Sequence, residues 1–389
     1  MYFFYFLLGA VIFWGARGFK RHEWNEEYSS LSQTKIILGI QALLIPIHHM
    51  AQKTCAPWHQ AKYIVHGLDV FVPIGHLLVS VFFFCSGLGL YKSFKNKKDY
   101  LKGFIGKRIV PLIIAFYLSE FIYVIMRLLM HEKMDAKRLL WYLSGTNMAN
   151  MNCWYIIVII FFYFFFYLAF RFCKKEGVAI FWMFFACVAY AVLGAFVGHP
   201  TEGLLRGEWW FNSIILFPLG LVFAKHEEKI TAFFKKAYPV LLPVVLIGTY
   251  VLHVLSEVAQ GVWGYYGEYS HDPLMIPHRL GCCAVQWVLC IFYTASWFLI
   301  SLKIRLGNRL LALLGSVTLE LYLMHGMFVE IFGYDFLEKM PSLYYIKNVP
   351  LYILVVFACS IPLTFIYHVV WKALVKLLPF NKTAKKSAS

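Results

Sequence analysis

The stretch KIILGIQALLIPIHHMAQ (residues 35–52) is an apolar run with a lysine at one end and two adjacent histidines near the other. A helix of about 20 such residues crosses the roughly 30 Å hydrocarbon core of a bilayer. Within hydrocarbon, a lone spanning segment satisfies its backbone N–H and C=O groups only as a helix. This stretch therefore predicts a transmembrane helix that carries imidazoles.

Apolar segments of similar length recur along the whole chain. Of its 389 residues 61% are hydrophobic and only 14% are charged, and the mean hydropathy is +0.66. Soluble domains carry about a quarter charged residues, so this composition excludes that class. We predict an all-α, polytopic membrane protein with about eleven transmembrane helices. The candidate spans are 2–19, 35–54, 70–91, 109–131, 152–172, 178–198, 210–225, 238–256, 281–302, 310–332 and 349–374.

The net charge of +16 is distributed unevenly between the loops. Most of the 36 Lys and Arg residues lie in alternate loops, at 17–35, 92–108, 171–175, 225–236, 303–309 and 372–386. Basic loops stay on the cytoplasmic side of a membrane. The pattern predicts a multi-pass protein of the cell (plasma) membrane, with the N-terminus outside and the C-terminus in the cytoplasm. The charge thus indicates contact with the lipid bilayer and not with nucleic acid.

Several polar side chains fall inside the predicted spans. Gln41, His48 and Gln52 are spaced by seven and four residues, which places them on one helix face. The helical rise places His49 about two-thirds of the way across the bilayer, and His325 in the 310–332 span reaches a similar depth. Polar groups in membrane helices face a bundle interior or a cavity. We therefore expect a polar chamber that opens toward the outside.

Two acidic residues are expected inside the same bundle. Glu120 falls near the middle of the 109–131 span, and Glu320 lies one turn from Ser316 in the 310–332 span. Carboxylates are rare at such depth and often functional. A structural hydrogen bond between two helices explains them equally well at this point. The cysteines show no metal-binding spacing, so no metal site is expected.

Six motifs occur in a fixed order along the chain. They are LSQTKIILGIQALLIPIHHMAQ (31–52), VSVFFFCSGLGLY (79–91), GKRIVPLIIAF (106–116), WYIIVIIFFYFFFYLAF (154–170), LFPLGLVFAKHEEKI (216–230) and LGSVTLELYLMHG (314–326). Together they resemble the acyltransferase-3 family of integral membrane acyltransferases. The resemblance extends over about residues 30–370. The chain departs from the family pattern at Leu38 and Ile105, where the family carries basic residues; Lys35 and Lys107 are the nearest bases.

The resemblance implies a domain organisation. The family core has ten spans, so residues 1–30 would be an additional N-terminal helix with a basic loop. Residues 31–378 would form the acyltransferase-3-like membrane domain, and 379–389 a basic cytoplasmic tail. The stretch WGYYGEYSHD (263–272) in a predicted outer loop could stack on sugar rings.

The resemblance also implies the activity and the roles of the candidate residues. An acyl group, commonly acetyl, would pass from cytoplasmic acyl-CoA to a hydroxyl of an envelope or extracytoplasmic glycan or lipid-linked sugar. His49 would be the catalytic base, because a neutral imidazole can take the hydroxyl proton. His48 would be its neighbour in the same site. The remaining candidates are His325, Ser86 and Trp154 as oxyanion donors; Arg108, Lys107 and Ser86 at acetyl-CoA; and Gln52, Glu120, Glu320 and Trp154 around the substrate.

A second class of function fits some of the same residues. A proton-coupled transporter or flippase of a polar or lipid-linked substrate would also use buried carboxylates and histidines. Such transporters often contain internal repeats, and the two halves of this sequence show none. A family member without activity, or one acting as a homodimer, is also compatible with the sequence.

Overall fold

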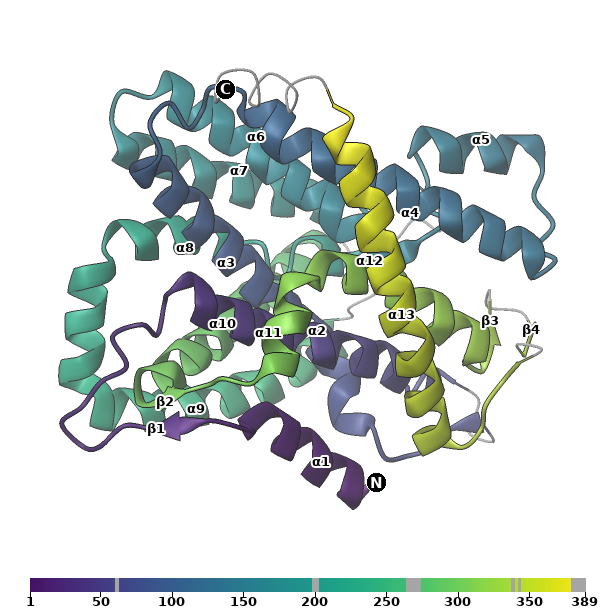
Figure 1. Cartoon of the computed structure of the whole chain (residues 1–389), viewed down its shortest axis with the longest axis horizontal. Helices are drawn as coiled ribbons and strands as arrows, with labels where there is room; N and C mark the ends of the chain where they lie inside the picture. Colours follow the sequence, from purple (N-terminus) through teal and green to yellow (C-terminus); the bar gives the residue numbers. More distant parts are fainter. Residues whose placement is uncertain (60–62, 198–202, 264–273, 337–339, 342–343, 379–389) are drawn as a thin grey trace. The chain divides into compact units, whose positions relative to one another are not determined.

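The computed structural model describes residues 1–59, 63–197, 203–263, 274–336, 340–341 and 344–378 (Figure 1). The predicted tail 379–389 and nearly all of the aromatic stretch 263–272 lie outside these ranges. The described chain is almost entirely helical. Its long helices are α1 (Tyr2–Phe13), α2 (Leu31–Thr54), α3 (Gly75–Asn96), α4 (Val110–Leu129), α5 (Ala136–Ser144), α6 (Trp154–Phe172), α7 (Glu176–Val197), α8 (Leu216–Lys225), α9 (Glu227–Trp263), α10 (Met275–Lys303), α11 (Arg309–Ser316), α12 (Thr318–Phe332) and α13 (Val349–Lys376).

Short elements connect these helices. One π-helical turn (Ile105–Ile109) precedes α4, and single 3₁₀ turns occur at Asp69–Ile74, Met151–Cys153 and Glu208–Trp210. Two minimal antiparallel ladders pair β1 (Arg17–Gly18) with β2 (Ile304–Arg305) and β3 (Asp335–Phe336) with β4 (Met340–Pro341). The first ladder holds together two loops that the charge pattern assigns to the same side of the membrane.

All eleven predicted apolar stretches contain helix, which confirms the all-α membrane fold. Within the described ranges, eight helices are long and apolar enough to cross a bilayer, and α11 with α12 makes a ninth if the two are taken as one span. The helices α1 and α8 are apolar but shorter. Hydrocarbon leaves the backbone no other partner than itself, so each apolar stretch folds as helix regardless of its side-chain pattern.

The predicted span at 310–332 is not one continuous helix, because α11 and α12 meet at an angle of 87°. Directly before the break, α11 packs closely on α2. A Cβ atom on Gly315 would lie 1.9 Å from the backbone oxygen of Lys35, so the two helices touch backbone to backbone. Val317 then leaves the helical conformation, with φ −126° and ψ 29°. Ser316 and Glu320 consequently belong to different helices and do not share a face.

The chain divides into two compact units, which we describe separately. Unit 1 comprises Met1–Leu78, Ile114–Cys153 and Lys303–Ser389, and unit 2 comprises Val79–Ile113 and Trp154–Leu302. In unit 1, α2 packs on α11 and α12, and α12 packs on α13 (Figure 1). The helix α2 begins at Ser30, whose hydroxyl accepts a hydrogen bond from the Gln33 backbone N–H, a typical N-cap.

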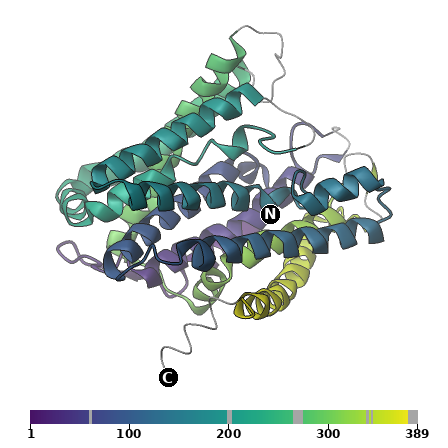
Figure 2. The same ribbon diagram turned by 90° about the horizontal axis from the view of Figure 1, so that it is seen from above.

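Unit 2 contains α6 to α10 and most of α3. The helices α6 and α7 pack side by side. The long helices α9 and α10 form an antiparallel pair (Figure 2), in which Thr249 lies against Ser296 and the Ala259 backbone oxygen accepts from the Cys282 thiol. Each unit therefore contributes its own set of candidate site residues.

Candidate active site

Three histidines of unit 1 form a cluster where α2 meets α12. The His49 ring centroid lies 4.9 Å from that of His48 and 5.1 Å from that of His325. His48 is 8% exposed, His325 is fully buried, and His49 between them is half-buried. The structure thus brings together the three histidines proposed from the sequence, although His325 lies more than 270 residues after the other two in the chain.

Backbone carbonyls orient the two outer rings of the cluster. The Nδ1 atom of His325 lies 2.9 Å from the Leu321 oxygen, and the Nδ1 atom of His48 lies 2.7 Å from the Phe71 oxygen. A carbonyl only accepts, so each Nδ1 carries the proton and donates it. In a neutral ring Nε2 is then left with a lone pair. The Nε2 atom of His325 is buried without a hydrogen-bond partner among the described residues.

The middle ring has no such anchor to the backbone. Within the described ranges His49 makes no hydrogen bond to the backbone, and the side chain of Gln52, one turn further along α2, is its polar neighbour. His49 can therefore present either ring nitrogen to a substrate, whereas His325 presents an acceptor. A neutral His325 fixed in this tautomer cannot donate from Nε2 to an oxyanion, which disfavours one of its predicted roles.

A close backbone approach fixes the position of His48. Gly75 begins α3, and a Cβ atom added there would lie 2.3 Å from Nε2 of His48. Gly75 follows the 3₁₀ turn that contains Phe71, the residue whose oxygen accepts from Nδ1. The same short segment therefore holds both edges of the His48 ring.

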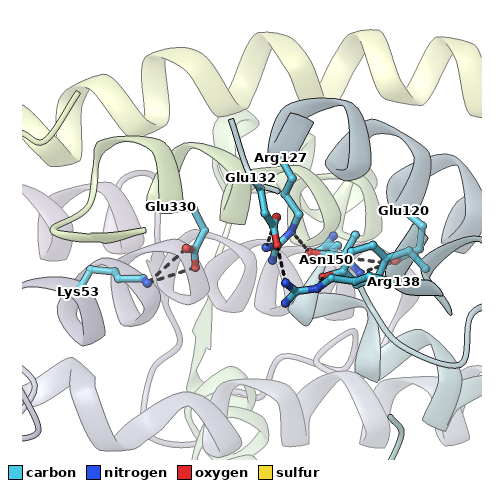
Figure 3. Close-up of polar contacts among 9 residues, drawn as sticks. Lys53, Glu120, Arg127, Glu132, Arg138, Asn150 and Glu330 are labelled. Atoms are coloured by element: carbon cyan, nitrogen blue, oxygen red, sulfur yellow. Dashed lines mark hydrogen bonds and ion pairs between the residues drawn. The ribbon is translucent and has the colours of Figure 1, made fainter. Parts of the chain in front are cut away.

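An ion pair lies one turn beyond the cluster. Lys53, four residues after His49, has its Nζ atom 3.3 Å from the carboxylate of Glu330 on α12 (Figure 3). The two contacts His49–His325 and Lys53–Glu330 show that α2 and α12 run in the same direction here. The pair is partly exposed, with 21% and 31% of the two side chains accessible.

Glu120 is buried at 2% exposure and serves the loop before α6 (Figure 3). Its two carboxylate oxygens accept hydrogen bonds from the backbone N–H groups of Ala149, at 2.6 Å, and Asn150, at 3.1 Å. The Asn150 amide in turn donates to Ser119 Oγ at 2.8 Å and to the Leu323 oxygen at 2.9 Å. Glu120 thus holds a loop whose Asn150 side chain hydrogen-bonds to α12 two residues before His325.

Glu320 has a different partner. Its carboxylate lies 2.6 Å from Nδ1 of His368 on α13. Glu320 is almost fully buried, and the His368 side chain is 32% accessible. Both carboxylates found in the sequence are therefore engaged in contacts between elements of unit 1. These contacts match the alternative stated from the sequence, in which the two carboxylates form structural hydrogen bonds.

The remaining candidates belong to unit 2. Ser86 on α3 lies close to the hydroxyls of Tyr155 and Tyr163 on α6. Trp154, the first residue of α6, is 8% exposed and its ring lies 6.2 Å from that of Trp210. Ser86 and Trp154 are thus placed within unit 2, and the histidines within unit 1.

The basic segment before α4 has two kinds of lysine. Lys92 pairs with Glu227 at 2.8 Å and Lys95 with Glu176 at 2.9 Å, so these two help to hold unit 2 together. The exposed Lys107 and the half-buried Arg108 lie in the π-helical turn, and the Arg108 guanidinium lies 5.7 Å from the Tyr100 ring centroid. In the described part of the chain Lys107 makes no ion pair, so its charge is available to a ligand.

Sequence reasoning missed Lys53, Asn150, Glu330 and His368. Lys53 and Glu330 could have been found from the sequence, because each lies within five residues of a cluster histidine on the same helix. Asn150 lies in a polar loop without periodicity, so nothing in the sequence indicates that it grips α12. His368 is isolated in an apolar span.

Comparison with known families agrees with this geometry. The family described as Acyltransferase domain, acyltransferase-3, matches residues 36–369, which include every helix from α3 to α12 and most of α2 and α13. Searches of curated proteins and of solved structures returned no significant match. The matched region holds the histidine cluster, the buried carboxylates and the basic turn. The chain is therefore a member of the acyltransferase-3 family and a multi-pass membrane acyltransferase.

Proposed function

We propose that this acyltransferase moves an acetyl group from cytoplasmic acetyl-CoA to a hydroxyl of an extracytoplasmic glycan or lipid-linked sugar. The observation that carries the proposal is the placement of the His49 ring between two imidazoles whose Nδ1 atoms are held by Leu321 and Phe71. Such a cluster supplies proton acceptors at fixed positions, which acyl transfer to an alcohol requires.

His49 is the proposed general base. A sugar hydroxyl is a poor nucleophile until a base removes its proton as the oxygen attacks the thioester carbonyl. The new C–O ester bond forms while the C–S bond breaks, and the CoA thiolate leaves. The proton taken by His49 is then available to that thiolate, or to the lone pair of His325 beside it. The negative charge that develops on the carbonyl oxygen needs hydrogen-bond donors.

The donor is proposed to bind at the basic turn before α4. Coenzyme A carries several phosphate charges, and arginine binds phosphate with two parallel hydrogen bonds. Arg108 and Lys107 lie in a π-helical turn, a feature that occurs often at functional sites. The exposed Lys97, Lys98 and Lys102 surround the same segment and add positive potential.

The transporter alternative finds less support in the contacts of the two buried carboxylates. A proton relay needs acidic groups that exchange protons with a pathway. Glu120 is committed to two backbone N–H groups and Glu320 to His368, and the family is one of acyltransferases. We therefore do not propose transport.

The test is mass spectrometry of envelope glycans from cells with and without this chain. We expect a loss of one acetyl unit per modified residue in the cells that lack it. Restoring the parent chain should return the acetyl group, and His49→Ala should not. Glycans that are identical in all these cells would contradict the proposed acceptor. Acetyl-CoA turnover by the purified protein would then show whether the donor assignment survives.

A further inference from the structure

Five ring-bearing side chains form a cluster on the loops that follow α2 and α12. The members of this aromatic cluster are Trp58, His59, Tyr63, Tyr334 and Tyr345. Tyr334 lies at its centre, with ring centroids 4.0 Å from Tyr63, 5.6 Å from Tyr345 and 6.1 Å from His59. Trp58, 6.2 Å from His59, is 58% exposed. Rings from two distant segments thus meet at one place.

The aromatic cluster is joined directly to the histidine site. The Nε2–H of His59 donates to the backbone oxygen of Gln52 at 2.7 Å, and Gln52 is the neighbour of His49. Gly333, which precedes Tyr334, lies against the stem of Lys53, since a Cβ there would be 3.3 Å from Lys53 Cγ. The order along both helices is therefore the same: histidines, then the Lys53–Glu330 pair, then the rings.

This combination of groups is suited to a sugar. One face of a pyranose ring is formed by C–H groups, which pack on aromatic faces, while its rim carries hydroxyls that need hydrogen-bond partners. The Lys53–Glu330 pair offers both donors and acceptors and is partly open to solvent. Binding sites commonly join apolar aromatic walls to a few fixed polar groups in this way.

A membrane-interface belt is the other explanation for tyrosines and tryptophans at helix ends. Belt residues spread around the perimeter toward lipid headgroups. Here the rings contact one another across the ends of the two helices that carry His49 and His325, next to a charged pair. That arrangement is explained by a ligand site and not by a belt.

We propose that the aromatic cluster and the Lys53–Glu330 pair form the acceptor subsite, which holds a sugar ring so that its hydroxyl reaches His49. This inference rests on the proposed function and specifies where its sugar acceptor binds. The chemistry does not depend on which sugar is bound, because the contacts are to a ring face and to hydroxyls.

The experiment measures transfer from radiolabelled acetyl-CoA to envelope polysaccharide, prepared from cells lacking the chain and treated with mild alkali. The full-length protein is purified in lauryldimethylamine oxide, because maltoside detergents carry sugars. Trp58→Ala and Tyr334→Ala should each raise KM for the polysaccharide about tenfold, the scale of one lost aromatic contact. The KM for acetyl-CoA should stay within twofold of the parent value.

Matched variants separate recognition from folding. Trp58→Phe and Tyr334→Phe keep a ring and should retain most of the affinity for polysaccharide. Tyr250→Ala removes a 70% exposed tyrosine from α9, outside the cluster, and should change neither KM. If Trp58→Ala and Tyr334→Ala leave the KM for polysaccharide unchanged, the subsite is wrong while the proposed function stands. If the parent transfers no acetyl to polysaccharide, the glycan acceptor and the subsite both fail.

Discussion

In a His49→Ala variant the middle imidazole of the cluster is lost, while both flanking rings keep their backbone hydrogen bonds. Loss of a general base lowers a rate by about 10²–10⁴-fold. The effect on stability should be small, because His49 is only half-buried and makes no backbone hydrogen bond to any residue that the structure describes. We expect the variant to fold, to bind acetyl-CoA like the parent, and to transfer acetyl at least about 100-fold more slowly.

Replacing either flanking histidine should reduce stability more than replacing His49 does. His48→Ala removes the donor to the Phe71 oxygen, and His325→Ala removes the donor to the Leu321 oxygen. The loss of one buried hydrogen bond costs about 0.5–1.5 kcal/mol, and the lost ring leaves a cavity besides. We therefore expect both variants to melt at lower temperature than His49→Ala. His48→Ala should keep part of its activity, since the His49 ring and Gln52 remain.

The assay pairs initial rates of acetyl transfer with thermal unfolding of the same detergent-purified samples. His253→Ala is the control, because it removes a half-buried histidine from α9 in unit 2. If His49→Ala transfers at near the parent rate while His48→Ala is inactive, the two roles are reversed. If all three cluster variants remain active, the cluster is structural and the mechanism is wrong.

Three further predictions concern single contacts. Gly75→Ala should lower the transfer rate by displacing His48, whose Nε2 would lie 2.3 Å from the new Cβ. Gly89→Ala on the same helix is the control, because its Cβ meets nothing within 4 Å and should leave the rate unchanged. Initial rates of acetyl transfer test this prediction. Glu120→Gln should lower the melting temperature, because the single amide oxygen cannot replace both carboxylate oxygens that accept from Ala149 and Asn150. The variant should retain transfer activity. Complete loss of activity with an unchanged melting temperature would instead indicate a chemical role for Glu120. Calorimetry should show acetyl-CoA binding that weakens as salt rises, and a smaller salt dependence in Arg108→Ala; equal salt dependence in both proteins would remove Arg108 from the donor site.

The helical architecture was predictable because hydrocarbon imposes it. Every apolar stretch found in the sequence contains helix, since a backbone without water has only itself to bond. The break at Val317 was not predictable from composition. The break lies next to a close contact between Gly315 and the backbone of Lys35, which is 280 residues earlier in the chain.

The histidine cluster was predicted in part for a reason that the structure does not support. The sequence placed His49 and His325 at one depth by assuming a straight helix over 310–332. The bend removes that argument, yet the two rings lie 5.1 Å apart. The partners of Glu120 and Glu320 could not be inferred, because hydropathy gives depth along a helix and says nothing about which neighbour a side chain meets.

The helix α12 explains why the site depends on contacts that the sequence does not reveal. Its 15 residues extend about 22 Å, less than the hydrocarbon thickness, so its own length does not fix its position in the membrane. Three of its carbonyls instead accept side-chain hydrogen bonds: Leu321 from His325, Leu323 from Asn150 and Val329 from the Tyr352 hydroxyl. The last two donors come from the loop before α6 and from α13. The helix is therefore held from two sides at the level of His325. The lone pair on Nε2 of His325 is thereby held in one position before any substrate arrives, which is the kind of preorganisation that the proposed acyl transfer would use.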